Sequence, residues 1–299
     1  MTRRELLALM AGTLVRATRR LPANNNLKWA VSSNLWNYFP RVPFTDILDV
    51  MKDTGFIGIR LTQFPQILKT FDVTAAQLQK ETSVRGCQII TISFNGPTQD
   101  PGRRSEVIAN AKTAMNFLRE FGAHHLVVFS PNRTNASAPD AFKSMCECFN
   151  EIGAVAGEMG FRAGLHNHMG QIVQNPGEVD RCMAMTDPKL FSFSPDTAHL
   201  HLAGCDVVKT IDKYKQRLMM VDYKDAKRLE DAKPDTFDRN SIFDLGDGEV
   251  DFRGCHRVLK SVSFKGWLVV DLDIARQGPR VSYERCGAYA INQLEPIYA

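Results

Sequence analysis

Residues 124–168 read HHLVVFSPNRTNASAPDAFKSMCECFNEIGAVAGEMGFRAGLHNH, and this stretch decides the fold. It begins with the short apolar run HHLVVFS and ends with a second one, RAGLHNH. Between them lies a long segment with apolar residues at helical spacing, which ends on Gly160. Short apolar runs predict buried strands, and glycine commonly follows the last turn of a helix. The stretch therefore predicts a strand–helix–strand unit with two parallel strands.

The same alternation extends over the rest of the chain. The segment PFTDILDVMKDTG (43–55) has Thr45 as a candidate N-cap and Gly55 as a stop, and SEVIANAKTAMNFLREFG (105–122) repeats the pattern. Candidate strands recur about every 34 residues, the usual length of one strand–helix unit. They begin near Trp29, Ile57, Gln88, His124, Arg162, Phe191, Leu218 and Trp267.

Eight such units predict an α/β fold, a single-domain (β/α)8 TIM barrel. A doubly wound open sheet is the alternative. It would need a glycine-rich phosphate turn after the first strand, and SSNLWNYFP (32–40) offers none.

Charge is concentrated at the N-terminus. The chain of 299 residues has 37 basic and 33 acidic residues, a net charge of +4. Residues 1–20 hold five arginines and one glutamate, which leaves 32 basic and 32 acidic residues in the body. A nucleic-acid groove needs clustered positive charge, so composition gives no support for a nucleic-acid partner. The seven cysteines lack a repeating spacing, and we expect them to be buried and unpaired.

Residues 1–23 read MTRRELLALMAGTLVRATRRLPA and allow two interpretations. Twin arginines before a short apolar run resemble a twin-arginine export signal, which would take the protein to the periplasm. The basic cluster at Arg16, Arg19 and Arg20 instead suits an amphipathic helix of a cytoplasmic protein. The export signal is slightly favoured. The run is too short to span a bilayer, so we predict no other membrane contact, and residues 24–299 form the barrel domain.

The last four predicted strands all end in side chains that bind metals. The fifth ends in His166 and His168, and Asp196 follows the sixth, with His199 just beyond it. Carboxyl ends of parallel strands meet at the face of a barrel where active sites form. A lone aspartate there is usually a helix N-cap, but four consecutive strands ending this way favour a site. The seventh and eighth strands supply Asp222, Lys224, Asp225, Asp271 and Asp273.

The connection after the seventh strand is unusually long, about forty residues from Asp225 to Gly266. It would lie over the active-site face, so we predict a substrate-covering loop. The alternative is a disordered insertion. The tight turn GDGEVDF (246–252), with Val250 and Phe252 as apolar anchors, argues against disorder.

The combination of these motifs resembles the xylose isomerase-like barrels, and within them the inosose dehydratases and sugar-phosphate isomerase/epimerase-type proteins. The resemblance rests on HNHMG (166–170), VQNPGEVDRCMAMTDP (173–188), SPDTAHLHLAG (194–204), VDYKD (221–225), GDGEVDF (246–252) and GWLVVDLD (266–273). It covers about residues 160–273, and before that the similarity is only topological.

The resemblance implies one divalent metal ion. Carried over, the family's ligand positions fall on His166, Asp196, Asp222 and Asp271, of which only Asp196 keeps the usual residue type. The set of one imidazole and three carboxylates favours Mn²⁺, and Mg²⁺, Co²⁺ or Zn²⁺ are compatible with it. Isomerases of this superfamily use paired glutamates as acid and base. Neither glutamate is present, which favours elimination over epimerisation.

We therefore predict a metal-dependent lyase or isomerase that acts on a keto-sugar, keto-cyclitol or keto-glycoside. Alternatives are a sugar epimerase or isomerase, a non-catalytic carbohydrate-binding barrel with a degenerate metal site, and, less favoured, an endonuclease of the same superfamily. A homo-oligomer is compatible with the sequence. The candidate base is His168, and His199 is the candidate acid or a ligand of the substrate hydroxyl. Lys224 is the candidate donor to a substrate oxygen, and the alternative is an ion pair of Lys224 with Asp225 or Asp247. The candidate substrate-binding residues are Trp36, Asp247 and Asp273.

Overall fold

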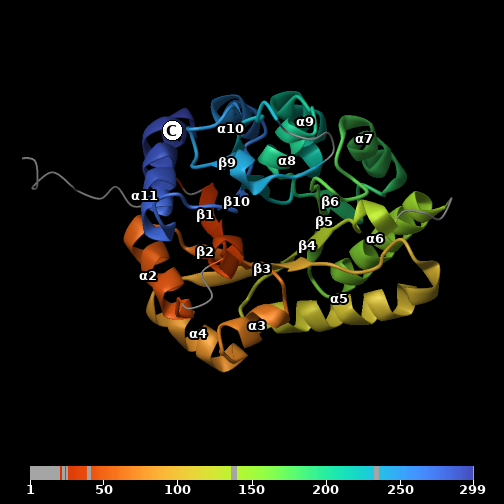
Figure 1. The fold of residues 1–299 in the computed structure, drawn as a ribbon. Helices are drawn as coiled ribbons and strands as arrows, with labels where there is room; N and C mark the ends of the chain where they lie inside the picture. Colours follow the sequence, from red (N-terminus) through yellow and green to blue (C-terminus); the bar gives the residue numbers. More distant parts are fainter. Residues whose placement is uncertain are drawn as a thin grey trace, which may run out of the picture.

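A computed structural model describes residues 21, 24, 26–38, 42–135, 140–231 and 236–298 of the chain. Within these ranges, eight parallel strands form one curled sheet surrounded by helices, which confirms the predicted barrel (Figure 1). The strand order is β6-β5-β4-β3-β2-β1-β10-β7. The strands are β1 (Leu27–Ser32), β2 (Gly58–Leu61), β3 (Gln88–Phe94), β4 (His125–Phe129), β5 (Arg162–His166), β6 (Phe191–Phe193), β7 (Val221–Tyr223) and β10 (Gly266–Val270).

The barrel closes between β6 and β7 through two isolated parallel bridges. One joins Phe193 to Leu218, and the other joins Asp196 to Asp222. The amide of Met219 donates to the Phe193 carbonyl at 2.8 Å, and the amide of Asp222 donates to the Pro195 carbonyl at 2.8 Å. The seam is therefore closed by isolated backbone bonds rather than by a continuous ladder.

The helices form the outer ring (Figure 1). The helix predicted from residues 43–55 is confirmed and ends at Gly55, whose φ of 89° is the left-handed conformation that glycine adopts without strain. The predicted N-cap Thr45 is wrong, because the helix begins at Phe44 and the cap position is Pro43, which has no side-chain cap. The helices are α2 (Phe44–Thr54), α3 (Gln66–Thr70), α4 (Ala75–Val84), α5 (Arg104–Arg119), α6 (Ala141–Glu158), α7 (Pro176–Met185), α8 (Thr197–Leu202), α9 (Val207–Tyr214), α10 (Phe252–Ser261), α11 (Pro279–Tyr289) and α12 (Glu295–Tyr298), with 3-10 turns η1 (Ser33–Tyr38), η2 (Pro101–Arg103), η3 (Arg133–Asn135), η4 (Lys215–Arg217) and η5 (Arg239–Ser241) and a π turn η6 (Ala290–Leu294).

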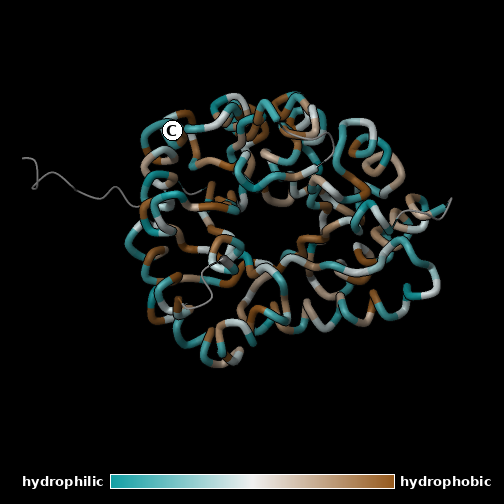
Figure 2. The backbone as a smooth tube through the Cα atoms, in the orientation of Figure 1, coloured by the Kyte–Doolittle hydropathy of each residue, from teal (hydrophilic) through white to brown (hydrophobic). Residues whose placement is uncertain are grey.

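Two apolar clusters fill the molecule. The larger lies between the strands and the helices, and the smaller is made of residues on or next to the strands, so it fills the barrel itself. Hydrophobic and hydrophilic residues alternate around the whole ring in Figure 2. Gly58 is required here, because a Cβ atom would lie 2.5 Å from the Trp267 ring. All seven cysteines are buried and free, as predicted.

The long connection after β7 is folded back on itself. β8 (Asp225–Ala226) pairs antiparallel with β9 (Ile242–Phe243). The Asp225 carboxylate accepts hydrogen bonds from the amides of Ala226 (2.9 Å), Gly246 (2.8 Å), Gly248 (2.9 Å) and Val250 (3.2 Å). Val250 and Phe252 are buried, as predicted. Residues 232–235 lie outside the described residues.

The N-terminal prediction lies almost wholly outside the described residues. Of residues 1–23, only Leu21 is described; it is 3% exposed and belongs to the larger apolar cluster. Core packing therefore starts before the predicted boundary at residue 24. The export signal stays a prediction. Among the described residues, no helix combines the length and the apolar character that a membrane span requires.

Candidate active site

The four predicted metal positions come together at the carboxyl end of the barrel. His166 ends β5, Asp196 follows β6, Asp222 lies on β7 and Asp271 follows β10. The His166 Nδ1 atom lies 2.9 Å from Asp222 Oδ2, and its Nε2 atom lies 3.7 Å from Asp196 Oδ2. All four side chains are buried. The small apolar cluster of the barrel interior comes from β1, β3, β4, β10 and the residues just before β7.

Arg60 on β2 lies among these side chains, and the sequence analysis missed it. Its Nη2 atom lies 2.9 Å from Asp271 Oδ2, and its Nη1 atom lies 3.4 Å from Asp222 Oδ2. The same Nη1 atom lies 3.4 Å from His166 Nδ1. Arg60 is 1% exposed. The sequence contained one signal for it, the single charged residue in the apolar strand sequence IGIRL (57–61). A buried arginine needs carboxylate partners, so this residue indicated an ion-pair cluster.

Lys224 forms a second buried cation. Its Nζ atom lies 2.5 Å from Asp273 Oδ2, 3.1 Å from Asp271 Oδ2 and 3.8 Å from Asp196 Oδ2. Neither Asp225 nor Asp247 is its partner, so that alternative is wrong: the Asp225 carboxylate is occupied by backbone amides. Asp273 also accepts a hydrogen bond from Asn34 at 2.6 Å.

Two histidines lie beside Lys224. The rings of His168 and His199 are 3.6 Å apart between centroids, and His199 Nε2 lies 3.4 Å from Lys224 Nζ. His168 Nδ1 lies 2.6 Å from the Met169 carbonyl, so Nδ1 carries the proton and Nε2 keeps its lone pair. Phe237, from the loop after β7, lies 5.5 Å from His168 and 4.7 Å from His199 between ring centroids. The predicted covering loop thus contacts both histidines.

Burial dominates the titration of the site. It raises the pKa of Asp222 to about 7, against the opposing charge of Arg60. It also raises the pKa of Asp196 well above its usual range. The pKa of Asp271 is lowered instead, because Lys224 and Arg60 together outweigh desolvation. Burial, reinforced by Lys224, lowers the pKa of His168 to about 4, which keeps this imidazole neutral near pH 7.

The donor set fits a divalent cation. Asp196 Oδ2, Asp222 Oδ1 and Asp271 Oδ1 are buried and accept no hydrogen bond. Buried carboxylate oxygens are costly unless they are paired or bound to a cation. When all four aspartates, counting Asp273, are ionised, they exceed the two cations by two charges, which one divalent ion would neutralise. Without the ion, burial and this excess of negative charge raise the pKa values of Asp196 and Asp222. Among the described residues, no group of three or more histidine, cysteine, aspartate or glutamate side chains has the geometry of a metal site. Arg60 and Lys224 pair with these carboxylates.

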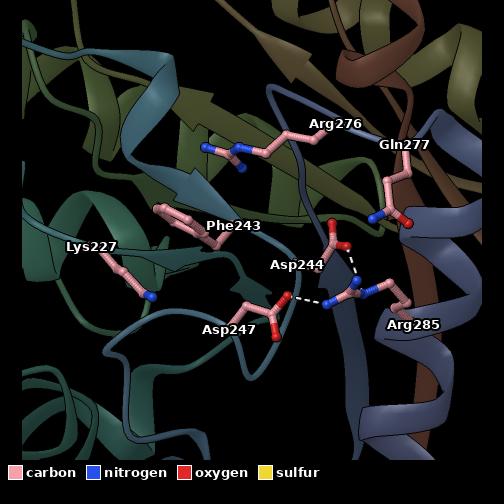
Figure 3. A pocket seen from close by; sticks show the side chains of 7 residues that line it. All are labelled: Lys227, Phe243, Asp244, Asp247, Arg276, Gln277 and Arg285. Atoms are coloured by element: carbon pink, nitrogen blue, oxygen red, sulfur yellow. Dashed lines mark hydrogen bonds and ion pairs between the residues drawn. The ribbon is translucent and has the colours of Figure 1, made fainter.

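Two predicted substrate-binding residues lie elsewhere. Trp36 is buried and stacks on Tyr283, with ring centroids 5.0 Å apart, so it belongs to the core. Asp247 lines a separate surface cavity of about 310 Å³, where it pairs with Arg285 (Figure 3). Arg285 also binds Asp244 at 3.1 Å, so both acids of that cavity are paired with the same guanidinium. Asp273 alone of the three joins the buried cluster.

Comparison with known proteins identifies the family. A family model described as xylose isomerase-like TIM barrel matches residues 47–285, so the chain belongs to that family. The inosose dehydratase of Clostridium perfringens is 33% identical over 151 residues, which cover 48% of this chain and 50% of that enzyme. The match thus spans about half the length of that relative. The inosose dehydratase of Geobacillus thermodenitrificans is 27% identical over 265 residues, 81% of this chain and 85% of that enzyme.

A solved structure shows the same fold. The crystal structure of the IOLI protein with a bound zinc atom has a TM-score of 0.75 at 14% identity, and the match covers 91% of this chain and 99% of that chain. At this identity the likeness concerns the fold alone.

Proposed function

We propose that the protein is a dehydratase that removes water from a keto-cyclitol or a closely related keto-sugar. The observation that carries the proposal is the pair His168 and His199, whose tilted rings are in close contact, with Lys224 next to His199 and the carboxylate cluster beside Lys224. The inosose dehydratase relatives support the choice of reaction and substrate class.

His168 is the base of this proposal. Its Nε2 lone pair is free because Nδ1 donates to the Met169 carbonyl. The Nε2 atom takes the proton from the carbon next to the substrate ketone, and the electron pair of the broken C–H bond forms the new carbon–carbon double bond. General base catalysis of this kind typically contributes about 10²- to 10⁴-fold.

His199 and Lys224 supply the proton for the departing hydroxyl. His199 Nδ1 has no hydrogen-bond partner, and its Nε2 faces the Lys224 ammonium at 3.4 Å. Burial alone would lower the pKa of Lys224, but Asp271, Asp273 and Asp196 together raise it, so the lysine stays protonated. The Lys224 ammonium donates to Nε2, which places the His199 proton on Nδ1. As Nδ1 gives that proton to the hydroxyl, Nε2 takes one from Lys224 in the same step, and the hydroxyl leaves as water when its carbon–oxygen bond breaks.

The metal dependence belongs to the same proposal. His166, Asp196, Asp222 and Asp271 would hold the ion, and a bound divalent ion would polarise the ketone and acidify the neighbouring C–H bond. The base His168 and the acid His199 lie side by side. The proton would therefore be removed from carbon, and the other proton given to the hydroxyl, on the same side of the substrate. Two-base epimerisation needs groups on opposite faces, so the arrangement favours elimination.

The test is turnover of oxidised cyclitols, sugars and glycosides with added Mn²⁺, with loss of one water followed by mass spectrometry. We expect a keto-cyclitol or a keto-sugar to lose water, and His168→Gln to reduce kcat by about 10²- to 10⁴-fold. His201→Gln is the matched control, because His201 lies on the same short helix as His199 but pairs with Glu249 at 3.0 Å. Turnover that yields an epimer without water loss would refute the dehydratase assignment.

A further inference from the structure

Among the residues that the structure describes, the side-chain partners of Arg60 are all candidate metal ligands. Its two Nη atoms contact Asp271, Asp222 and His166, and its Nε atom is buried without a hydrogen-bond partner. The guanidinium is held by the same carboxylates that a divalent ion would need. Arginine also remains charged at any pH that the fold survives, so its charge cannot be removed by losing a proton.

Two cations cannot share these oxygens without cost. A divalent ion bound by Asp222 and Asp271 would lie within a few ångströms of the guanidinium, in surroundings from which water is largely excluded. Repulsion between charges is much stronger there than in bulk water. Metal binding must therefore either displace Arg60 from the two aspartates or proceed against its charge.

We infer that Arg60 competes with the divalent ion for Asp222 and Asp271 and thereby sets the metal affinity of the site to a low value. The inference rests on the metal dependence in the proposed function. Arg60 is then a positioning residue. Without metal, its guanidinium holds the two carboxylates in place, and it releases them when the ion binds. Lys224 cannot take this role alone, because no contact joins it to Asp222.

The experiment is a calorimetric titration of the full chain with Mn²⁺, after removal of bound metal with a chelator. We expect Arg60→Gln to bind Mn²⁺ at least tenfold more tightly than the wild type. Arg60→Lys keeps the charge and should stay within about threefold of the wild type. Arg85→Gln is the matched control, since Arg85 also binds two carboxylates, Asp49 and Glu81, but lies outside the barrel. It should not change Mn²⁺ binding.

A second measurement covers the case in which Arg60→Gln folds poorly. At the site, this variant retains the four buried aspartates, but Lys224 is the one cation left beside them. Mn²⁺ should therefore raise the Tm of Arg60→Gln by more than it raises the Tm of the wild type. Equal or weaker Mn²⁺ binding by Arg60→Gln, together with an equal Tm shift, would overturn the competition. Absence of binding in all variants would instead refute the metal dependence of the proposed function.

Discussion

Asp196 uses its two carboxylate oxygens differently. Oδ1 accepts the backbone amide of His199 at 3.0 Å and caps α8, whereas Oδ2 is buried without a hydrogen bond. One oxygen therefore serves the fold, and the other is left for a cation. Asparagine caps a helix about as well as aspartate, so a single substitution can separate the two roles.

We expect Asp196→Asn to keep the Tm within a few degrees of the wild type and to weaken Mn²⁺ binding at least tenfold, because the cap survives and the charge is lost. Calorimetric titration with Mn²⁺ and a thermal melt measure the two effects. Asp206→Asn is the control, since Asp206 caps α9 through the amide of Lys209 far from any candidate ligand. Wild-type Mn²⁺ affinity in Asp196→Asn would show that Asp196 is not a ligand.

At the residue scale, the sequence predicted most of the cluster, including Lys224, but not Arg60. Strand ends identify His166, Asp196, Asp222 and Asp271, because parallel strands bring their carboxyl ends to one face. Arg60 lies on the second strand, and a search of the last four strands could not find it. Phe237 lies in a polar segment without periodicity, so only the folded loop shows that it contacts His168 and His199.

At the element scale, Asp225 holds the loop after β7. Asp225→Ala removes the acceptor of four backbone amides and should lower the free energy of unfolding by about 3 kcal/mol, as expected for buried hydrogen bonds to a charged group. Urea unfolding measures the loss, and limited proteolysis should cut the loop between β8 and β9 faster. Asp238→Ala, which removes an acceptor of one amide in the same loop, should cost less than about 1 kcal/mol. Equal losses in both variants would contradict the anchoring role of Asp225.

Elements were predictable where periodicity was strong. All eight strands were placed, but the strand expected from Leu218 begins at Val221, because residues 218 and 219 bridge to Phe193 instead of joining a ladder. The paired strands β8 and β9 were missed, since two residues each cannot show an alternating pattern. Tertiary hydrogen bonds to Asp225 define this hairpin, and no local signal encodes them.

At the scale of the whole molecule, stability should depend on pH through His256. This histidine is buried, stacks on Trp29 and binds the Tyr223 hydroxyl at 2.8 Å, and burial lowers its pKa from 6.5 to about 3. Between these two pH values, His256 binds a proton in the unfolded chain but not in the folded chain. The contribution of His256 to the free energy of unfolding is therefore complete above pH 6.5 and is lost as the pH falls toward 3.

From pH 7 to pH 5, the wild type should therefore lose about 2 kcal/mol of unfolding free energy relative to His256→Gln. Urea unfolding of both proteins at the two pH values gives this difference directly, and it cancels the contributions of other titrating groups. His124→Gln, at an exposed position, should follow the wild-type profile. Parallel pH profiles for the wild type and His256→Gln would show that His256 is not the group responsible.

The isolated bridges between β6 and β7 have a consequence for hydrogen–deuterium exchange. A wall joined by so few backbone bonds should open there first, so the amides of Met219 and Asp222 should exchange faster than those of β4. Asp196 and Asp222 lie on opposite sides of this seam, and an ion bound by both would cross-link it reversibly. Mn²⁺ should then slow deuterium uptake in residues 218–223 severalfold and leave residues 125–129 unchanged. Each opening of the wall would require release of the ion, which ties the lifetime of the closed barrel to the occupancy of its active site.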